Sequence, residues 1–245
     1  MLLNVQEVYS GYRQVPVIRD ITFSIEKGEM IGLIGLNGAG KTTLLRTILG
    51  LLPLQKGKIE IDSVTIAQDH AAYASQVAYI PETPILYEEL TLKEHIMMTA
   101  LGYNIPFEEA MHRAEPLLKL FRLDQQLNWF PIYFSKGMKQ KVMIICALIT
   151  QAKLLIVDEP FIGLDPLAIN HLKSLLKDYA QHGRSVLFTT HILSIAQELC
   201  DRYLILSQGE LIAKGTLEEV ASNLNMTAST ADDLYLALVE RAEAV

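Results

Sequence analysis

A glycine-rich segment, "GLNGAGKTTLL", combines residue types that suit the binding of phosphate groups. It matches the pattern G-x-x-x-x-G-K-[ST] at Gly35, Gly40, Lys41 and Thr42. Glycines let successive backbone amides turn toward phosphate oxygens, and the helix that follows directs its positive N-terminal end at the same anion. We expect Lys41 to reach the β- and γ-phosphates of a nucleotide, Thr42 to ligate Mg²⁺ and Thr43 to donate to the α-phosphate. The predicted phosphate loop comprises Gly35, Leu36, Asn37, Gly38, Ala39, Gly40, Lys41, Thr42 and Thr43.

Two acidic residues and a histidine follow two further apolar segments. Asp158 and Glu159 end the run "LLIVDEP", and His191 follows the run "SVLFTT". Parallel sheets bind ligands at the carboxyl ends of their strands, so neighbouring strands would bring these three side chains to one edge. There Asp158 suits an outer-shell contact with Mg²⁺, Glu159 suits proton acceptance from an attacking water, and the His191 ring N–H suits the γ-phosphate. The alternatives are a solvated turn for the acids and a helix cap or core residue for His191.

The strands that must carry these residues are visible in the hydrophobic pattern. The segments "LLNVQEV" and "IRDITFSIEKGE" alternate apolar and polar residues, whereas "MIGLIG" is continuously apolar, as a central parallel strand is. Together with "GKIEID", they predict a mixed sheet. Further along, the strand patterns "AKLLIVDEP", "SVLFTTH", "DRYLILSQ" and "ELIAKG" alternate with the helical patterns "PLAINHLKSLLKDYAQ" and "LSIAQELC". This alternation is typical of a parallel sheet that is covered by helices.

Between about Pro84 and Gln151 the apolar residues recur at helical spacing. The segments "LTLKEHIMMTALGY", "FEEAMHRAEPLLKLF" and "GMKQKVMIICALIT" predict three successive helices. Thr91 and Glu94 have the spacing of a capping box at the start of the first of them. A polar stretch, "NMTASTADD", precedes a last short helix that we expect to end at Val245.

Composition limits the classes of protein to which the chain can belong. Its 245 residues suffice for one large domain, or for one domain with an inserted subdomain. The net charge of -7 argues against a nucleic-acid partner, because binding to phosphate backbones needs a basic face. We find no signal-peptide pattern and no apolar run of the ~20 residues that span a bilayer. The two cysteines, Cys146 and Cys200, are expected to be reduced thiols in apolar surroundings.

The order of these motifs resembles that of the ATP-binding cassette subunits of ABC transporters, over about residues 2–215. The resemblance implies an α/β fold of the P-loop NTPase type. Its core has a mixed sheet, with an antiparallel β subdomain and an inserted α-helical subdomain. The implied ATPase domain covers residues 1–215: residues 1–82 and 152–215 form the nucleotide-binding core with the β subdomain, and residues 83–151 form the helical subdomain. Residues 216–245 would form a short C-terminal helical tail.

The segment "FSKGM" lies where the family has its signature sequence, commonly L-S-G-G-Q. Ser135 and Gly137 are retained, while Lys136 replaces a glycine and Met138 replaces glutamine. Ser135 suits the N-cap of the helix that follows. In the family this helix end faces the γ-phosphate of ATP on another subunit. The resemblance therefore implies that Ser135 and Gly137 bind ATP in trans, in a dimer of two cassettes that we expect to be a homodimer.

Three further positions receive roles from the resemblance. Tyr12 falls where the family stacks an aromatic ring on adenine. Glu82 stands where the family usually has a glutamine that ligates Mg²⁺; a carboxylate keeps the metal contact but loses the donor. Asp165, in "GLDP", belongs to the loop that faces the partner subunit, and it also suits the cap of the helix opened by Pro166. Lys136, Lys139 and Lys141 would face the nucleotide or form an ordinary solvated face.

The implied function is that of an ATP-hydrolysing transporter subunit. It would lie in the cytoplasm, on the inner face of the membrane, bound to polytopic transmembrane subunits and using ATP and Mg²⁺. We expect Tyr87 and Trp129 to belong to the docking surface. The short tail and the segments "PETP" and "SKGMKQK" are similar to those of bacterial exporter-type subunits. A soluble ABC ATPase acting in macromolecular assembly or repair is the alternative, and an inactive nucleotide-gated scaffold conflicts with the presence of Lys41, Glu159 and His191.

Overall fold

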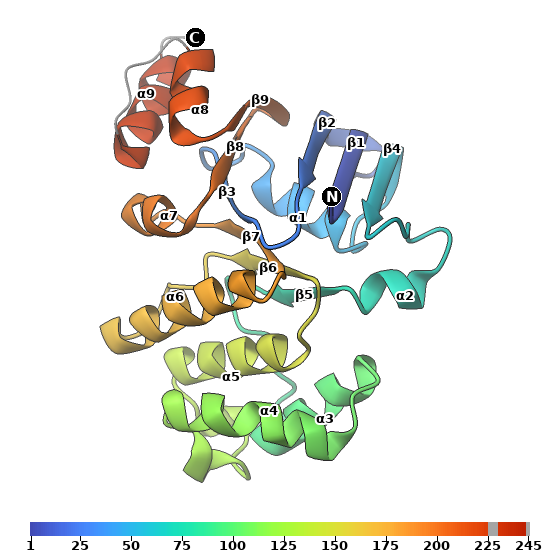
Figure 1. Cartoon of the computed structure of the whole chain (residues 1–245), viewed down its shortest axis with the longest axis vertical. Helices are drawn as coiled ribbons and strands as arrows, with labels where there is room; N and C mark the ends of the chain where they lie inside the picture. Colours follow the sequence, from blue (N-terminus) through green and yellow to red (C-terminus); the bar gives the residue numbers. More distant parts are fainter. Residues whose placement is uncertain (225–229, 244–245) are drawn as a thin grey trace.

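The computed structural model describes residues 1–224 and 230–243, which are built around a six-stranded sheet. The strand order is β5-β6-β7-β3-β8-β9, and all neighbours are parallel except β8 and β9 (Figure 1). This order places the strands that end at the phosphate loop, the acidic pair and the histidine side by side. The strands span β3 (Met30–Ile34), β5 (Val77–Ile80), β6 (Leu154–Asp158), β7 (Ser185–Thr189), β8 (Arg202–Ser207) and β9 (Glu210–Gly215).

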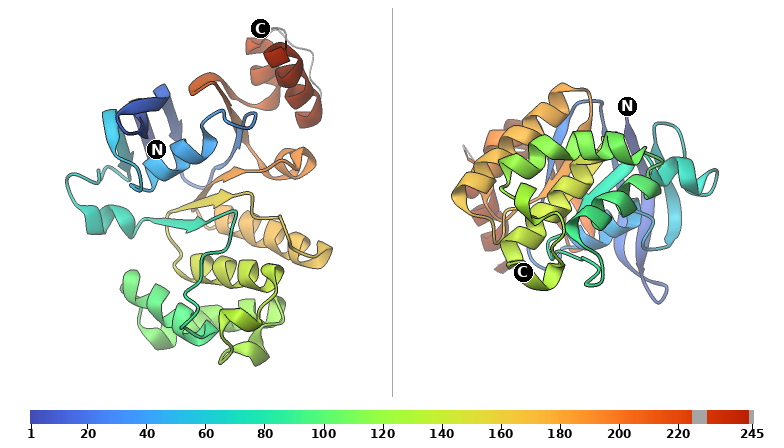
Figure 2. Two further views of the ribbon diagram at one scale, coloured as in Figure 1. Left: turned by 180° about the vertical axis from the view of Figure 1, so that it is seen from behind. Right: turned by 90° about the horizontal axis from the view of Figure 1, so that it is seen from below.

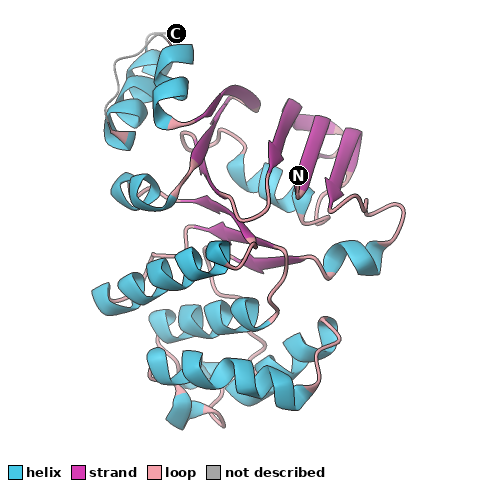
Figure 3. Ribbon diagram, viewed as in Figure 1, coloured by secondary structure: helices cyan, strands magenta, loops and turns pink. Residues whose placement is uncertain are grey.

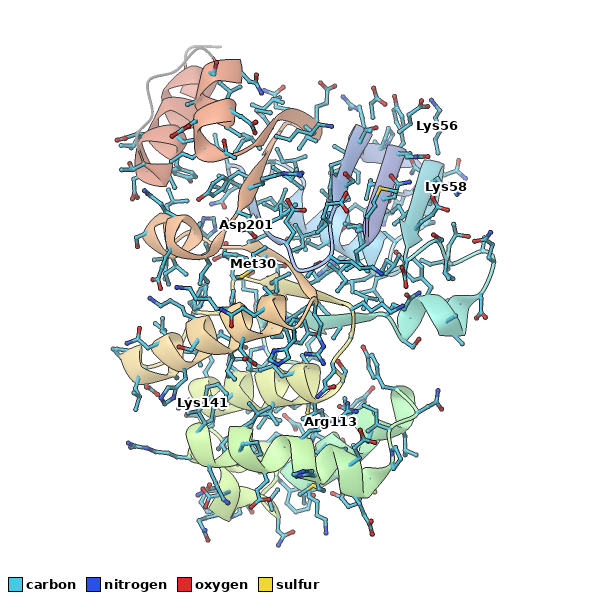
Figure 4. The ribbon with its side chains drawn as sticks, in the orientation of Figure 1. Met30, Lys56, Lys58, Arg113, Lys141 and Asp201 are labelled. Carbon is cyan, nitrogen blue, oxygen red and sulfur yellow. The ribbon has the colours of Figure 1, made fainter. Side chains whose placement is uncertain are left out.

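A second, antiparallel sheet lies beside the first and has the order β2-β1-β4 (Figure 3). Its strands are β1 (Leu3–Tyr12), β2 (Val15–Ile25) and β4 (Leu54–Ile61). The outer strand β4 carries Lys56 and Lys58, which point to solvent, as edge strands that avoid further pairing often do (Figure 4). The second sheet corresponds to the antiparallel β part that the sequence predicted.

Helices cover the six-stranded sheet on one face, and α1 with the antiparallel sheet covers the other. Met30 and Ile34 pack among the helices, whereas Ile31 and Leu33 pack toward α1. Because successive side chains of a strand point to opposite faces, β3 must be apolar throughout. The helices are α1 (Lys41–Ile48), α2 (His70–Ala74), α3 (Leu92–Gly102), α4 (Phe107–Leu120), α5 (Lys136–Ile149), α6 (Pro166–Gln181), α7 (Leu193–Leu199), α8 (Leu217–Asn223) and α9 (Ala231–Glu243), with 3-10 turns at Asp124–Gln126 and Pro131–Tyr133.

Helices α3, α4 and α5 stack together at the end of the molecule opposite α8 and α9 (Figures 1 and 2). Arg113 of α4 donates to the carbonyl of Ile149 at 2.7 Å and so ties α4 to the C-terminal end of α5. Thr91 and Glu94 form the capping box that the sequence predicted at the start of α3. No helix within the two described ranges is long and apolar enough to cross a membrane.

Some elements are absent from the sequence prediction. Strand β5, with four residues, and the single-turn helix α2, with five, were not predicted, since such short segments show neither strand alternation nor helical spacing clearly. Helix α8 was predicted only as part of a helical tail. Most of the polar stretch "NMTASTADD", and the predicted helix end at Val245, lie outside the described residues. Cys146 and Cys200 are free thiols, and Cys146 is buried.

Candidate active site

A cavity of about 300 Å³ lies at the carboxyl end of β3, between the phosphate loop and the ends of β6 and β7. It brings together most of the residues that the sequence predicted for nucleotide binding, although they are up to 155 positions apart in the chain. Its lining consists of Val17, Leu36, Asn37, Gly38, Ala39, Gly40, Lys41, Thr42, Thr43, Glu82, Asp158, Glu159 and His191.

The backbone of the phosphate loop depends on its glycines. Gly40, the residue before α1, has φ 106°, a backbone conformation that residues other than glycine rarely adopt. At Gly35 an added Cβ would lie 2.4 Å from the carbonyl oxygen of Leu206 on β8, so the close approach to that strand also requires glycine. Helix α1 begins with neither a side-chain cap nor an acidic residue in its first turn. Its N-terminal amides therefore suit an anion in the cavity.

The ammonium group of Lys41 stays inside the loop. It donates to the carbonyl oxygens of Gly35 at 2.7 Å and Leu36 at 3.3 Å. Burial lowers the pKa of Lys41, while the negative charges of Glu159, Asp158 and Glu82 act in the opposite direction. The positive charge is thus held between carbonyl oxygens of the loop and three carboxylates, where a phosphate group would meet it.

Two neighbouring strands hold the acidic pair through Thr189. The hydroxyl of Thr189 on β7 donates to Asp158 Oδ1 at 2.6 Å and accepts from the backbone amide of Glu159 at 3.1 Å. Glu159 has φ 47°, an uncommon value for a residue with a side chain, and such strain often marks functional sites. Both acidic side chains are buried. The sequence predicted the acids at this edge but gave no sign of Thr189.

Glu159 and His191 are in contact, as adjacent parallel strands would require. The backbone amide of His191 donates to Glu159 Oε2 at 3.0 Å, and its ring Nε2 lies 3.3 Å from Oε1 without hydrogen-bond geometry. Oε1 is buried and has no hydrogen-bond partner among the described residues. Burial raises the pKa of Glu159, although His191 and Lys41 favour its charged form. A carboxylate with a raised pKa and a free oxygen in a cavity suits a general base.

The oxygen donors of Thr42, Glu82 and Asp158 line this cavity and also a second one of about 410 Å³ next to it. One hydroxyl and two carboxylates are the ligand types that Mg²⁺ prefers, and Mg²⁺ commonly takes its remaining ligands from waters and phosphates. Accordingly, the described part of the chain has no cluster of three or more His, Cys, Asp or Glu residues that could hold a metal by itself. The donor set fits a magnesium ion that is bound together with a nucleotide.

The segment that carries Glu82 is attached to α5. The buried amide of Gln140 donates to the carbonyl oxygen of Pro81 at 3.2 Å. This bond links α5 to the residue that directly precedes Glu82. Gln140 was not singled out from the sequence, because a polar residue one turn into a helix usually faces solvent.

Tyr12 lies outside the cavity lining. It ends β1, is 46% exposed, and accepts a hydrogen bond of 3.4 Å from Arg46 of α1. Val17, on the neighbouring strand β2, lines the cavity instead. Nothing in the sequence distinguishes Val17 from other strand residues, so it was not predicted.

Ser135 and Gly137 also lie outside the cavity lining, at the exposed N-terminal end of α5. The hydroxyl of Ser135 accepts from the amide of Met138 at 3.2 Å, which confirms the predicted N-cap. An added Cβ on Gly137 would lie 2.6 Å from the carbonyl oxygen of Gly163 in the same chain. Glycine at 137 therefore lets α5 pack closely against the loop that contains Asp165.

Lys141 has a different environment from the two considered in the sequence. Its side chain is only 16% exposed, and its ammonium lies 2.8 Å from Asp165 Oδ2 (Figure 4). Asp165 also accepts from the amide of Ala168 at 2.9 Å, so it caps α6 as predicted. The bond to Lys141 is the main reason why the pKa of Asp165 falls to about 2. Lys141 thus joins α5 to the start of α6 and is neither a nucleotide-facing nor a fully solvated residue.

Two apolar segments are exposed, one around Tyr87 and one around Trp129, and Ile85 of the first segment also lines the second cavity. Both are attached to the first turns of α3. The amide of Leu92 donates to the carbonyl of Trp129 at 3.0 Å, and buried His95 accepts from the amide of Tyr87 at 3.0 Å. The exposed side chains of the two segments are Ile85, Tyr87, Trp129, Phe130, Ile132 and Tyr133.

Comparisons with known proteins agree with this geometry. Residues 18–162 match the ABC transporter family. The chain is 50% identical, over 98% of its length and 97% of the relative's, to the ABC-type transporter ATP-binding protein EcsA of Bacillus subtilis (strain 168). The order of motifs, with the short tail and the segments "PETP" and "SKGMKQK", predicts a chain most like the Ecs transporter ATPase, and this similarity confirms that prediction.

Solved structures confirm the predicted fold class. A structure described as the ATP-binding subunit of an ABC transporter superposes with a TM-score of 0.93 and 45% identity, over 98% of this chain and 100% of that one. A second, the ATP-binding cassette MJ0796, described as dimeric in a post-hydrolysis state with ADP and Pi, superposes with a TM-score of 0.78. Its identity is 24%, over 88% of this chain and 99% of that chain, so it shows the fold alone.

Proposed function

The chain belongs to the ABC transporter family, in which it is an ATP-hydrolysing subunit, and from this premise we propose how its residues divide the work. The cavity of about 300 Å³ binds ATP and is the place of hydrolysis. The observation that carries this proposal is the meeting, in one cavity, of the phosphate loop with the buried acids and His191. We assign this cavity to the predicted core of residues 1–82 and 152–215.

Each side chain of the cavity has a task that its geometry supports. Lys41 and the amides of the phosphate loop hold the phosphates, and Thr43 donates to the α-phosphate. Glu159 accepts a proton from the attacking water, since Oε1 is its free acceptor. His191 keeps Glu159 oriented through its amide and offers its ring N–H to the γ-phosphate. Tyr12, which lies outside the cavity lining, would contribute its ring to the adenine side.

Thr42, Glu82 and Asp158 would hold Mg²⁺ in this scheme. When bound, the ion would neutralise phosphate charge and polarise the bond that breaks. The hydrogen bond from Thr189 fixes the orientation of the Asp158 carboxylate. Glu82 adds a second carboxylate to the lining of the second cavity. With a carboxylate in place of the family's glutamine, the amide donor that could orient the water is missing, and the orientation depends more on Glu159 and His191.

A second cassette completes the site. Ser135 and Gly137 lie outside the cavity of their own chain, at a helix end that is exposed and adjacent to Asp165. We propose that they bind the γ-phosphate of ATP held by another copy, in a homodimer with two such composite sites. The isologous contact of a two-fold dimer would let each copy give and receive this helix end.

The exposed apolar segments around Tyr87 and Trp129 are the proposed docking surface for a polytopic transmembrane subunit. Ile85 of the Tyr87 segment lines the cavity that also contains Glu82, so a partner docked on this segment would lie close to the proposed metal site. Such a contact would place the chain on the cytoplasmic face of the membrane. Export, which the sequence pattern favours, stays a prediction.

The docking proposal is tested with the double variant Tyr87→Ala and Trp129→Ala. Both side chains are exposed, so we expect a basal Mg-ATPase within about twofold of wild type, since surface changes cost little stability. Recovery of the chain with cell membranes, and its transport activity, should be lost. Equal loss of basal ATPase and membrane recovery would contradict a docking role.

A further inference from the structure

Tyr79 lies on β5, the strand that the sequence did not predict, next to the strand that ends in the acidic pair. In the parallel register Tyr79 is opposite Ile156 and Ile80 is opposite Val157. The Tyr79 hydroxyl reaches past the end of β5 and donates to Asp158 Oδ2 at 3.4 Å. Burial, followed by the charge of Asp158, raises the pKa of Tyr79, so this hydroxyl keeps its proton and remains a donor.

Asp158 is therefore held from both sides of its strand. Thr189 on β7 donates to Oδ1, and Tyr79 on β5 donates to Oδ2. A carboxylate has about four acceptor sites on its two oxygens, so both bonds leave lone pairs for further ligands. The two hydroxyls fix the plane of the carboxylate, and the fixed plane decides where those lone pairs point.

The position of Tyr79 relative to the two cavities indicates what its hydrogen bond to Asp158 does. Thr42, Glu82 and Asp158 line both cavities, whereas Tyr79 lines only the second, which also contains Arg46. The second cavity also reaches exposed Ile85 at the surface. Without the Tyr79 hydroxyl, water in that cavity would compete for Asp158 Oδ2 and the carboxylate could rotate.

We propose that Tyr79 is a positioning residue for the metal site. It acts through Asp158 and fixes that carboxylate from the side away from the phosphate loop. Mutation of a residue that orients a metal ligand typically lowers the metal affinity by about 10- to 100-fold. The proposal rests on the proposed binding of Mg²⁺ with ATP, and it assigns to Tyr79 a part of that binding which does not require contact with the nucleotide.

The test compares Tyr79→Phe with Tyr103→Phe. Tyr103 is a matched control because its hydroxyl donates to the carbonyl of Val77 at 2.6 Å, on the same strand β5 but away from Asp158. The readout is the dissociation constant of Mn²⁺, measured by electron paramagnetic resonance in the presence of a saturating non-hydrolysable ATP analogue. The affinity for the analogue without metal is measured separately.

We expect Tyr79→Phe to raise the Mn²⁺ dissociation constant about three- to tenfold, less than the usual effect of losing a hydrogen bond to a charged group, because this bond is long at 3.4 Å. Metal-free analogue binding should stay within about twofold, because Tyr79 does not line the nucleotide cavity. Tyr103→Phe should leave the Mn²⁺ constant unchanged. An unchanged constant in Tyr79→Phe, or an equal change in Tyr103→Phe, overturns the positioning role, whereas failure of the wild-type chain to bind Mn²⁺ with the analogue overturns the proposed metal site itself.

Discussion

The phosphate cavity and the N-terminal end of α5 are both suited to an anion, but they are built in opposite ways. The cavity has buried acids, a strained Glu159 and a lysine that is enclosed by its own loop. The α5 end is exposed, and its Ser135 hydroxyl accepts a hydrogen bond from Met138 of the same helix. The cavity thus encloses groups that can position a ligand, whereas Ser135 and Gly137 lie outside it, and we propose that another copy supplies their ligand.

The loop between these two regions connects them within one chain. Gly137 packs on the carbonyl of Gly163, and Lys141 pairs with Asp165, only six residues after Glu159. The α5 end therefore contacts a loop that begins a few residues after Glu159, the proposed general base. The comparison predicts that substitutions in the cavity abolish ATP hydrolysis, whereas substitutions at the α5 end abolish ATP-dependent dimerisation.

The largest effect is expected from Glu159→Gln. This change removes the proposed base but keeps the shape of the side chain, so turnover should fall by about 10² to 10⁴, the usual contribution of a positioned acid or base. Binding of ATP should be retained, because Lys41 and the loop amides are untouched. Steady-state phosphate release and a fluorescent-nucleotide titration measure the two quantities. Unchanged turnover would mean that the cavity does not perform the chemistry, and would favour the scaffold alternative.

The cavity was far more predictable from sequence than the α5 end. A glycine loop, a strand ending in two acids and a strand ending in histidine are local patterns, and strand order at a common sheet edge then brings them together. The contact of Lys141 with Asp165 depends instead on how two helix ends approach, which no local pattern encodes. Tyr79 was missed for a related reason, since β5 has only four residues and shows no clear period.

A second effect concerns how the buried Glu159 changes the stability of the folded chain with pH. Burial raises the pKa of Glu159, so the folded chain binds a proton there more readily than the unfolded chain, whose carboxyl titrates at its ordinary value of 4.5. The charged side chain therefore destabilises the fold above its folded pKa, and this cost disappears as pH falls toward 4.5. We expect Glu159→Gln to unfold at a higher temperature than wild type at pH 8. The difference should shrink toward pH 5. A difference that grows with acidity would contradict the assignment.

The smallest effect is expected from Lys141→Met, which removes the ion pair beneath the α5 end. Because Asp165 is half exposed, the pair should contribute only about 0.5 kcal/mol to the free energy of unfolding. The pKa of Asp165 is lowered to about 2 from 3.8, so this contribution is present above pH 4 and is lost as pH falls toward 2. Urea unfolding at pH 6 and pH 3 measures it. Lys139→Met, on the same helix, is the control and should have no such pH-dependent difference.

The central claim, that one chain carries half of each active site, is tested most directly at Ser135. Asp and Asn both serve as N-caps, so Ser135→Asp and Ser135→Asn should keep α5 intact, while only Asp places a negative charge against a γ-phosphate. In a Glu159→Gln background, light scattering with Mg-ATP should show a dimer for Ser135→Asn. For Ser135→Asp the dimer dissociation constant should rise at least about tenfold, as expected for opposed like charges. Equal ATP-dependent dimerisation of the two variants would contradict the account.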